Sequence, residues 1–341
     1  MKRIGNLYHK IYDIENIRLA HKNARKNKTH YTEVKEVDAN EEYYFTLLSD
    51  MLKNKQFTNS QYEVFIKNDK GKERTIYKLP YFPDRIVQHA ILQVLEPIWK
   101  KTLITNTYQS IKGRGIHKAK KDVIRAIKAL GHENIMYGQL DISKYYPSVD
   151  NVIMEKIIAK KIKCRDTIWL LNNIIQSMQG LPIGNYLSQY LGNLYLSYLD
   201  HYVKEVIKVK YYFRYCDDIV ILGVDKDELE SAIQAIKYKL KELNLEVKVG
   251  TKVRPLTTGL DFLGFVFYGR HTLLRKRIAN NFKQAVKKFA QHPTSHGISS
   301  IVSYNGWIIA SDSYNLWKKY INPELIDLMS DLGNINKVLW R

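Results

Sequence analysis

The chain has 341 residues, of which 54 are Lys or Arg and 34 are Asp or Glu, so its formal net charge at pH 7 is +20. Such an excess of cationic residues is typical of proteins that bind polyanions, including nucleic acid. Two cysteines exclude a disulfide framework and a CxxC metal motif, and the ten histidines show no HExxH spacing. The N-terminus lacks the apolar stretch of a signal peptide, and no apolar run is long enough to span a membrane. We therefore expect a cytoplasmic protein with no membrane segment.

The first part of the chain predicts a basic helical arm, a hairpin and a long helix. The arm covers the first thirty residues. Between Tyr62 and Lys78, apolar and polar residues alternate on both sides of a turn at 68–71, which predicts a β-hairpin. Apolar residues at helical spacing predict a helix from about Asp84 to Thr102. A basic loop that contains two glycines follows at 112–115.

The middle of the chain predicts an α+β arrangement. A strand is expected over 135–142, with Asp141 at its C-terminal end. Two helices (150–162 and 166–178) and the segment GLPIGN (180–185) follow it. Further along we expect a helix over 186–206, a hairpin that contains the sequence YCDD, a helix over 226–243 capped by Asp225, and strands over 245–250 and 260–269. The last seventy residues read as helices. This order indicates an antiparallel sheet with helices on one face, in which Asp141 ends beside the YCDD hairpin.

Three carboxylates would then meet, although they come from distant segments. Adjacent acidic residues at a hairpin tip are costly unless they are solvated, hydrogen-bonded or bound to a cation. Mg²⁺ prefers carboxylate oxygens together with substrate phosphates, and two such ions support nucleotidyl transfer. We expect Asp141 and Asp217 to bridge two Mg²⁺ ions, and Asp218 to support them. An Asp-Asp pair in a turn often only forms hydrogen bonds, but the order of the segments favours the metal site.

Aromatic and basic residues suggest how a nucleotide would be held. Tyr146 follows Asp141 closely, and its ring would lie under the sugar and exclude a 2′-hydroxyl; the alternative is a core aromatic. Arginines bind phosphate in a bidentate manner, and glycines let backbone N–H groups approach it. The residues expected to cover a triphosphate are Arg74, Arg85, Lys112 and Arg114, although each is individually compatible with a solvated surface charge.

The motifs DRIVQHAI, SIKGRGIHKA, LDISKYYPSVD, GLPIGNYLSQYLGNLYLSYLD, YCDDIVIL and DFLGF occur in the order of the blocks of reverse transcriptases. The chain resembles that family over nearly its whole length. The resemblance implies a right-hand polymerase fold with an N-terminal arm and fingers (1–130), a palm (131–269, with a helical insertion at about 150–180) and a short helical thumb (270–341). It also implies RNA-directed DNA synthesis, with Ile142 contributing to the metal site and Gln189 and Lys252 contacting substrate.

Within that family, the chain resembles the reverse transcriptases of diversity-generating retroelements. The likeness lies in GLPIGN followed by SQ, with Ile183 where retroviral and group II intron enzymes typically have Gln. It implies copying of a template-repeat RNA into cDNA with adenine-directed mutagenesis, helped by a small basic pentameric accessory protein. Ile183 cannot hydrogen-bond the template as Gln can, and we expect it, with Arg74, to permit misincorporation; packing at the entry of a helix is the plain alternative.

Other functions remain open at this stage. The chain could be an antiphage-defence or other stand-alone bacterial reverse transcriptase, which shares the chemistry but not the mutagenesis. It could also be an RNA-binding, maturase-like chaperone with an incidental polymerase site, or a structural basic protein, and neither of these would depend on Asp217.

Overall fold

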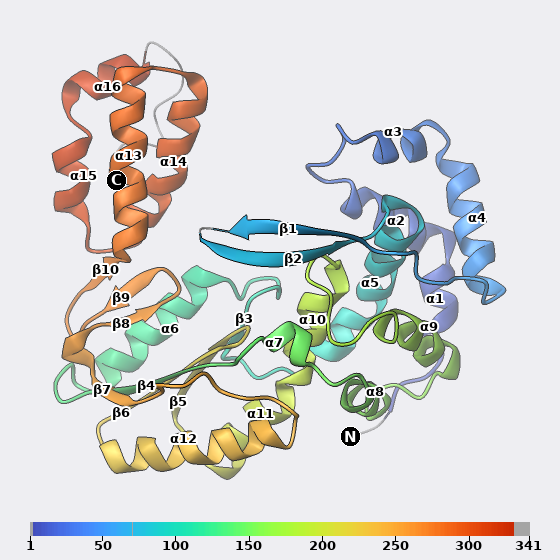
Figure 1. The fold of residues 1–341 in the computed structure, drawn as a ribbon, viewed down its shortest axis with the longest axis horizontal. Helices are drawn as coiled ribbons and strands as arrows, with labels where there is room; N and C mark the ends of the chain where they lie inside the picture. The colour runs from blue at the N-terminus through green and yellow to red at the C-terminus, as the bar shows by residue number, and fades with distance from the viewer. Residues whose placement is uncertain (1–2, 70, 331–341) are drawn as a thin grey trace. The chain divides into compact units, whose positions relative to one another are not determined.

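The computed structural model describes residues 3–69 and 71–330, and its chain forms two compact units (Figure 1). The first unit contains the N-terminal helices, a long hairpin and the segments that carry the three predicted carboxylates. The second contains a small sheet and the C-terminal helices. The first unit comprises residues 1–115, 140–219 and 231–251, and the second comprises residues 116–139, 220–230 and 252–341.

The N-terminal arm is helical, as predicted, and it packs on the long helix that follows the hairpin. Asp13 caps the second helix by accepting hydrogen bonds from the backbone N–H groups of Glu15 and Asn16. The Asn16 side chain donates to the carbonyl of Ala90 on α5, at 3.1 Å. The arm contains α1 (Tyr8–Tyr12) and α2 (Ile14–Ala24), and two helices that were not predicted follow it, α3 (Thr32–Ala39) and α4 (Glu41–Lys53). Helix α5 spans Ile86–Lys100.

The predicted hairpin is present. Strands β1 (Glu63–Asp69) and β2 (Lys72–Lys78) are antiparallel, and Lys67 lies opposite Arg74. The segment η1 (Tyr81–Arg85) leads from the hairpin into α5, and its backbone is extended at Phe82, with φ of −107° and ψ of 134°.

The central sheet has five strands in the order β3-β5-β6-β4-β7. Strand β4 lies beside β6, so the end of β4 comes next to the turn between β5 and β6. Strand β7 is antiparallel to β4, whereas the short β3, which the sequence did not predict, is parallel to β5. The strands are β3 (Thr107–Tyr108), β4 (Met136–Asp141), β5 (Tyr211–Tyr215), β6 (Asp218–Gly223) and β7 (Val253–Pro255).

Most predicted helices of this region are present, with differences at their ends. The helix predicted over 186–206 is divided at Leu196, where the buried hydroxyl of Ser197 donates to the carbonyl of Leu194. Helices α6 and α7 were not predicted. The helices are α6 (Ile116–Ala129), α7 (Tyr145–Ser148), α8 (Asn151–Ala159), α9 (Arg165–Ile175), α10 (Tyr186–Tyr195), α11 (Ser197–His201), η2 (Tyr202–Val206) and α12 (Lys226–Lys241).

Two predicted strands differ from the structure. The segment 260–269 is a hairpin of β8 (Leu260–Phe262) and β9 (Phe265–Phe267), because Leu263 and Gly264 turn the backbone at φ values of 59° and 86°. Over 245–250 the pairing is reduced to one antiparallel bridge between Val247 and Ile142. The 3₁₀ turn η3 (Leu256–Thr258) precedes β8, and β10 (Thr272–Leu274) pairs with β9.

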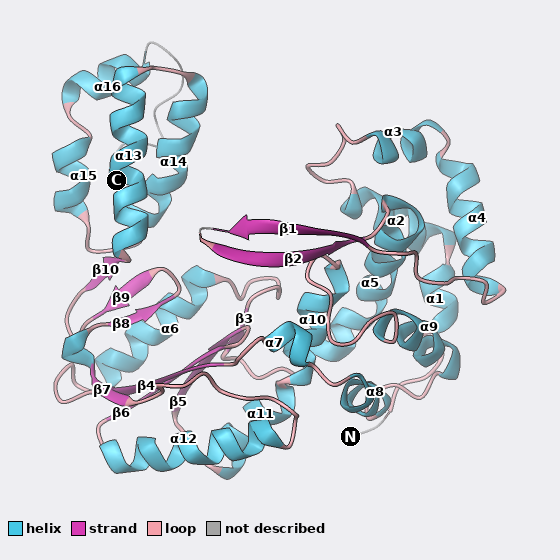
Figure 2. Cartoon of the chain, viewed as in Figure 1, coloured by secondary structure: helices cyan, strands magenta, loops and turns pink. Residues whose placement is uncertain are grey.

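From Lys276 the C-terminal part is helical, as predicted (Figure 2), but β10 lies within the last seventy residues, which were predicted to be helices. Phe282 and Phe289 of α13 and Ile301 and Ile308 of α14 are buried and form its core. The helices are α13 (Lys276–Gln291), α14 (Ser295–Ile309), α15 (Tyr314–Tyr320) and α16 (Pro323–Ser330), and the helix prediction for 331–341 lies outside the described residues. Within the described ranges, no helix has both the length and the apolar character needed to cross a membrane.

Candidate active site

The carboxylates predicted from the sequence lie at neighbouring positions of the central sheet. Asp141 is the last residue of β4, Asp217 lies in the turn after β5, and Asp218 is the first residue of β6. The N–H of Ile142 donates to the carbonyl of Asp217 at 3.3 Å, which joins the end of β4 directly to the turn. Ile142 itself is buried. The fold therefore brings together the segments that carry these carboxylates, although they lie far apart in the sequence.

An ammonium group that the sequence analysis did not single out also belongs to this cluster. The Nζ atom of Lys248 lies 2.8 Å from Oδ1 of Asp141, and the Lys248 N–H donates to the Asp141 carbonyl at 2.9 Å. The Asp141 and Lys248 side chains are 46% and 50% exposed, so water screens this ion pair and keeps it weak. Lys252, the lysine predicted to contact substrate, is exposed.

The charge balance of the cluster fits a hard divalent cation. Burial raises the pKa of the Asp217 carboxyl, and the nearby charge of Asp141 raises it further, whereas hydrogen bonds and the Lys248 ammonium oppose the rise. Two carboxylates thus repel each other, and a single solvated ammonium compensates them only in part. Oxygen donors in this arrangement are the ligands that Mg²⁺ prefers.

The two tyrosines after Asp141 have different environments. The hydroxyl of Tyr145 donates to the carbonyl of Gly192 on α10 at 2.5 Å, and its side chain is buried. Tyr146 lies against the carboxylate turn instead, because the Cys216 thiol donates to its hydroxyl at 3.4 Å. Burial raises the pKa of Tyr146, so its hydroxyl stays protonated at neutral pH. Both rings therefore lie near the turn, but Tyr146 hydrogen-bonds to the turn itself, whereas Tyr145 hydrogen-bonds to α10.

The GLPIGN segment docks on the hairpin. The carbonyl of Ile183 accepts a hydrogen bond of 2.8 Å from the N–H of Tyr77 in β2, the strand that also carries Arg74. Gly184 follows with φ of 127°, and a Cβ atom at this position would lie 2.6 Å from the Tyr77 carbonyl oxygen. The backbone on both sides of Ile183 is thus fixed against β2, while the Ile183 side chain is half-buried.

The other predicted substrate contacts lie at two separate sites: Gln189, Lys112 and Arg114 near the basic loop, and Arg85 at a cavity of the first unit. Gln189 on α10 is exposed and accepts a hydrogen bond of 2.6 Å from Ser110, at the start of the basic loop. Lys112 is exposed, as Arg74 is, but the Arg114 guanidinium donates to the carbonyl of Ile104, in the segment between α5 and β3, at 2.6 Å.

Arg85 faces a separate cavity of about 260 Å³ in the first unit, and the lining of this cavity does not include the three carboxylates. Burial lowers the pKa of Arg85, and its Nε donates weakly to the Ala24 carbonyl at 3.4 Å. The cavity is also lined by Lys28, Lys78 and the rings of Tyr31 and Tyr186. The lining also includes Glu33, whose carboxylate lies 3.8 Å from the Nζ atom of Lys78, so the cavity is not purely cationic. A substrate contact for Arg85 stays a prediction.

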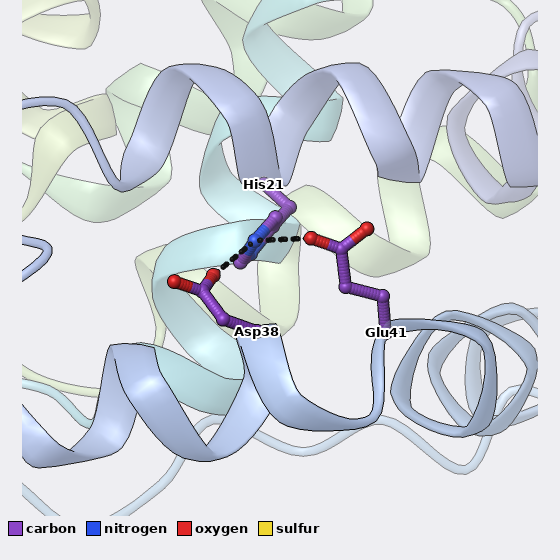
Figure 3. Close-up of side chains that lie close together, drawn as sticks. All are labelled: His21, Asp38 and Glu41. Carbon is purple, nitrogen blue, oxygen red and sulfur yellow. Dashed lines mark hydrogen bonds and ion pairs between the residues drawn. The ribbon is translucent and has the colours of Figure 1, made fainter.

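A second group of potential metal ligands lies in the N-terminal helices (Figure 3). The Nε2 atom of buried His21 lies 2.9 Å from Asp38 and 3.5 Å from Glu41, and its Nδ1 atom lies 2.9 Å from the Tyr81 hydroxyl. Asp38 is also paired with Arg25 at 2.6 Å. Each of these groups already has partners, so we assign the cluster a structural role in joining α2 to α3 and α4.

Comparison with known sequences agrees with this geometry. Residues 66–267, more than half of the chain, match the family described as reverse transcriptase (RNA-dependent DNA polymerase). The chain belongs to this family. It is therefore an RNA-directed DNA polymerase by family, and the matched region contains the three carboxylates, Tyr146, Ile183 and the hairpin strand of Arg74.

Two known proteins are similar to this chain at low sequence identity. Protein YkfC of Escherichia coli K12 is 24% identical over 311 residues, which cover 77% of this chain and 76% of YkfC. The group II intron-encoded protein LtrA of Lactococcus lactis is 26% identical over 196 residues, which cover 54% of this chain. The matched part is 31% of LtrA, so the chain corresponds to about a third of that protein.

Solved structures show the same fold class. Apo telomerase from Candida tropicalis has a TM-score of 0.53 at 11% identity and covers 80% of this chain and 56% of its own. Telomerase from Candida albicans, in complex with a fragment of telomeric RNA, has a TM-score of 0.52 at 10% identity and covers 85% and 63%. At such low identity the likeness shows the fold alone, a mixed α+β right-hand polymerase fold, as predicted.

Proposed function

We propose that this reverse transcriptase copies a template-repeat RNA into cDNA with adenine-directed mutagenesis, as in a diversity-generating retroelement. The position of the Asp141 strand end beside the turn of Asp217 and Asp218 supports the polymerase chemistry. The observation that carries the mutagenesis is Ile183, held by its backbone against the strand of Arg74. In this proposal residues 1–130 form the arm and fingers, 131–269 the palm and 270–341 the thumb.

Asp141 and Asp217 are the proposed ligands of two Mg²⁺ ions, with Asp218 and Ile142 in supporting positions. When bound, such ions lower the pKa of the primer 3′-hydroxyl and neutralise charge on the leaving pyrophosphate. The chain itself supplies position. Tyr146 lies beside the turn, where its ring would exclude a 2′-hydroxyl from the incoming sugar. Arg74 and Lys112 would neutralise the triphosphate, with Gln189 and Lys252 as further contacts.

The half-buried side chain of Ile183 offers no hydrogen bond to the template. A base pair held less firmly is discriminated less well, and a difference of about 1–3 kcal/mol changes error rates roughly 10- to 200-fold. Template RNA, cDNA and dNTPs are the proposed partners, together with a small basic pentameric accessory protein. The strongly positive chain suits the nucleic-acid partners.

The experiment is Mg²⁺-dependent extension on a primed RNA of mixed sequence, followed by sequencing of the cDNA. Wild type, Asp217→Ala and Ile183→Gln are compared, with Asp227→Ala on the exposed surface of α12 as the matched control. We expect Asp217→Ala to lower extension by on the order of 100- to 1000-fold, the loss typical of one electrostatic catalytic group. Ile183→Gln should retain extension and reduce errors opposite adenine.

The outcomes separate the candidates. Activity that survives Asp217→Ala contradicts the metal site. Faithful wild-type cDNA, or an error spectrum that Ile183→Gln leaves unchanged, contradicts the adenine-directed proposal. The result would then favour an antiphage-defence or other stand-alone bacterial reverse transcriptase, the second candidate, which shares the chemistry but not the adenine-directed mutagenesis.

A further inference from the structure

A fully buried arginine lies directly beneath the carboxylate turn. Arg214, on β5, has no exposed surface, and neither has Asp200, its ion-pair partner on α11. Its Nε and Nη2 atoms donate to the two carboxylate oxygens of Asp200, at 2.7 and 2.6 Å. The remaining contacts run toward the active site: Nη1 donates to the Cys216 carbonyl at 2.9 Å, and Nη1 and Nη2 donate to the side chain and carbonyl of Asn193 on α10. All five N–H groups of the guanidinium thus have acceptors.

The carboxylate of Asp200 also has a hydrogen-bond donor at each of its oxygens. Besides the guanidinium, it accepts hydrogen bonds from the Tyr212 hydroxyl at 2.6 Å and from the Thr107 hydroxyl at 2.8 Å. The network therefore joins β3, β5 and the helices α10 and α11 through side chains that are all buried. A planar guanidinium with bidentate geometry makes the relative orientation of its neighbours specific.

The carbonyl that Arg214 holds belongs to a residue in an uncommon conformation. Cys216 has φ of 56°, in the left-handed region that non-glycine residues rarely adopt. Such a conformation persists only when its surroundings fix it. Asp217 follows immediately, so the direction of its carboxylate depends on the peptide that Arg214 holds.

The same network reaches the basic loop. The side-chain amide of Asn193 donates to the carbonyl of Gln109 at 2.9 Å, and Gln109 and Ser110 also have positive φ values. The next residues of this loop include Lys112, a proposed triphosphate contact. Through Asn193, one buried charge pair is therefore connected both to the metal-ligand turn and to the start of the loop.

We propose that Arg214, with Asp200 and Asn193, is a positioning residue that sets the carboxylate turn for metal binding and aligns the basic loop with it. Replacing a buried ion pair by apolar groups is often neutral or favourable for stability, so stability alone explains such a pair poorly. The proposal rests on the proposed role of Asp217 as a metal ligand.

The test uses Arg214→Lys, which keeps the positive charge but cannot bond Asp200, Asn193 and Cys216 together. A second variant, Thr107→Val, removes one hydrogen bond to Asp200, keeps the side-chain shape, and serves if Arg214→Lys does not fold. Phe45→Leu is the control. Phe45 is buried in α4, so its truncation should destabilise the protein without removing a contact of the network. Steady-state extension is measured over a range of Mg²⁺ concentrations, and amide hydrogen exchange is measured without metal.

For folded Arg214→Lys we expect kcat to fall on the order of 100-fold, the effect of a small misplacement of a reacting group. The Mg²⁺ concentration for half-maximal rate should rise several-fold, while the KM for primer–template changes little. Thr107→Val should shift both quantities in the same direction by less. Exchange at 215–218 and 109–112 should accelerate in both variants but not in Phe45→Leu.

An unchanged Mg²⁺ dependence, together with unchanged exchange at 215–218, would overturn the proposal. So would losses in Arg214→Lys that Phe45→Leu reproduces at equal thermal stability. If wild type makes no cDNA at all, the proposed function fails, whereas the exchange measurement still decides whether Arg214 holds the turn.

Discussion

Asp217 occupies a position that favours its protonated form. Burial and the charge of Asp141 raise its pKa, so the folded protein binds this proton more tightly than the unfolded chain does. The stability associated with Asp217 is therefore fully present below its unfolded pKa of about 4 and is lost as pH rises through the folded-state pKa. Without a divalent cation, the site is less stable at neutral pH than the same fold with an uncharged side chain.

Asp217→Asn should accordingly raise the melting temperature at pH 7 in the presence of a chelator. The gain should disappear below about pH 4, where the wild-type carboxyl is protonated in both states. Thermal melts from about pH 3 to 8 measure this difference on both sides of the unfolded pKa, and Asp227→Asn, an exposed change on α12, is the control. A variant that melts below wild type at pH 7 would mean that the hydrogen bonds of Asp217 outweigh burial and repulsion.

The residue-scale predictions from sequence were strongest where chain order alone determines the neighbours. Asp141 at a strand end and Asp217 in a hairpin turn follow from local patterns, and strand adjacency then brings them together. Lys248 could not be located in this way. Its ion pair with Asp141 needs the irregular segment after α12 to return beside β4, and alternation over 245–250 predicted a strand without its partner.

At the scale of elements, the docking of GLPIGN on the hairpin depends on one glycine. Gly184→Ala would place a methyl group 2.6 Å from the Tyr77 carbonyl oxygen in a backbone conformation at φ of 127°. We expect a loss of about 1–3 kcal/mol from strain of this kind, with the hydrogen bond from Tyr77 to Ile183 weakened. Denaturant unfolding and hydrogen exchange at 63–69 and 73–78 measure it.

Gly306→Ala is the matched control, because no atom lies within 4 Å of a Cβ built at this helical position. It should leave the hairpin unaffected. If the hairpin amides exchange equally slowly in Gly184→Ala and in Gly306→Ala, the close approach of Gly184 to Tyr77 does not hold the GLPIGN segment against the hairpin.

Elements with a clear period were predictable, and those shaped by local hydrogen bonds or turns were not. The hairpin at β1 and β2 and the helix α5 have strong alternation or helical spacing. At the interruption near Leu196, the Ser197 hydroxyl donates to the carbonyl of Leu194, a contact that an apolar pattern does not record. In the same way, β8 and β9 read as one apolar strand because Leu263, a non-glycine residue, takes the left-handed turn position.

At the scale of the whole molecule, the net charge of +20 is the dominant property. On α13, Lys276, Lys283 and Lys287 recur at helical spacing, and Lys276 and Lys287 are exposed. If they contact phosphates, Lys276→Glu and Lys287→Glu should each weaken primer–template binding uniformly across sequences. Each should also reduce the slope of log K against log salt by about 1.

Fluorescence anisotropy from 50 to 200 mM salt measures that slope, with Lys53→Glu on α4 as an exposed control of equal charge change. Slopes that stay equal in all variants would show that α13 does not take part in binding. Wild-type affinity should itself fall steeply over this range, because released counterions drive phosphate binding.

The two cysteines differ in a way that has a practical use. Burial and the neighbouring Asp217 raise the pKa of Cys216 to about 12, so its thiol is almost never ionised at neutral pH. Burial also opposes ionisation of Cys164, at the N-terminus of α9, but hydrogen bonds from Thr167 and from the backbone outweigh it and lower the pKa of that thiol. A maleimide dye should therefore couple selectively to Cys164 in the unaltered protein, leaving the YCDD turn unmodified and providing a single-site optical reporter without mutagenesis.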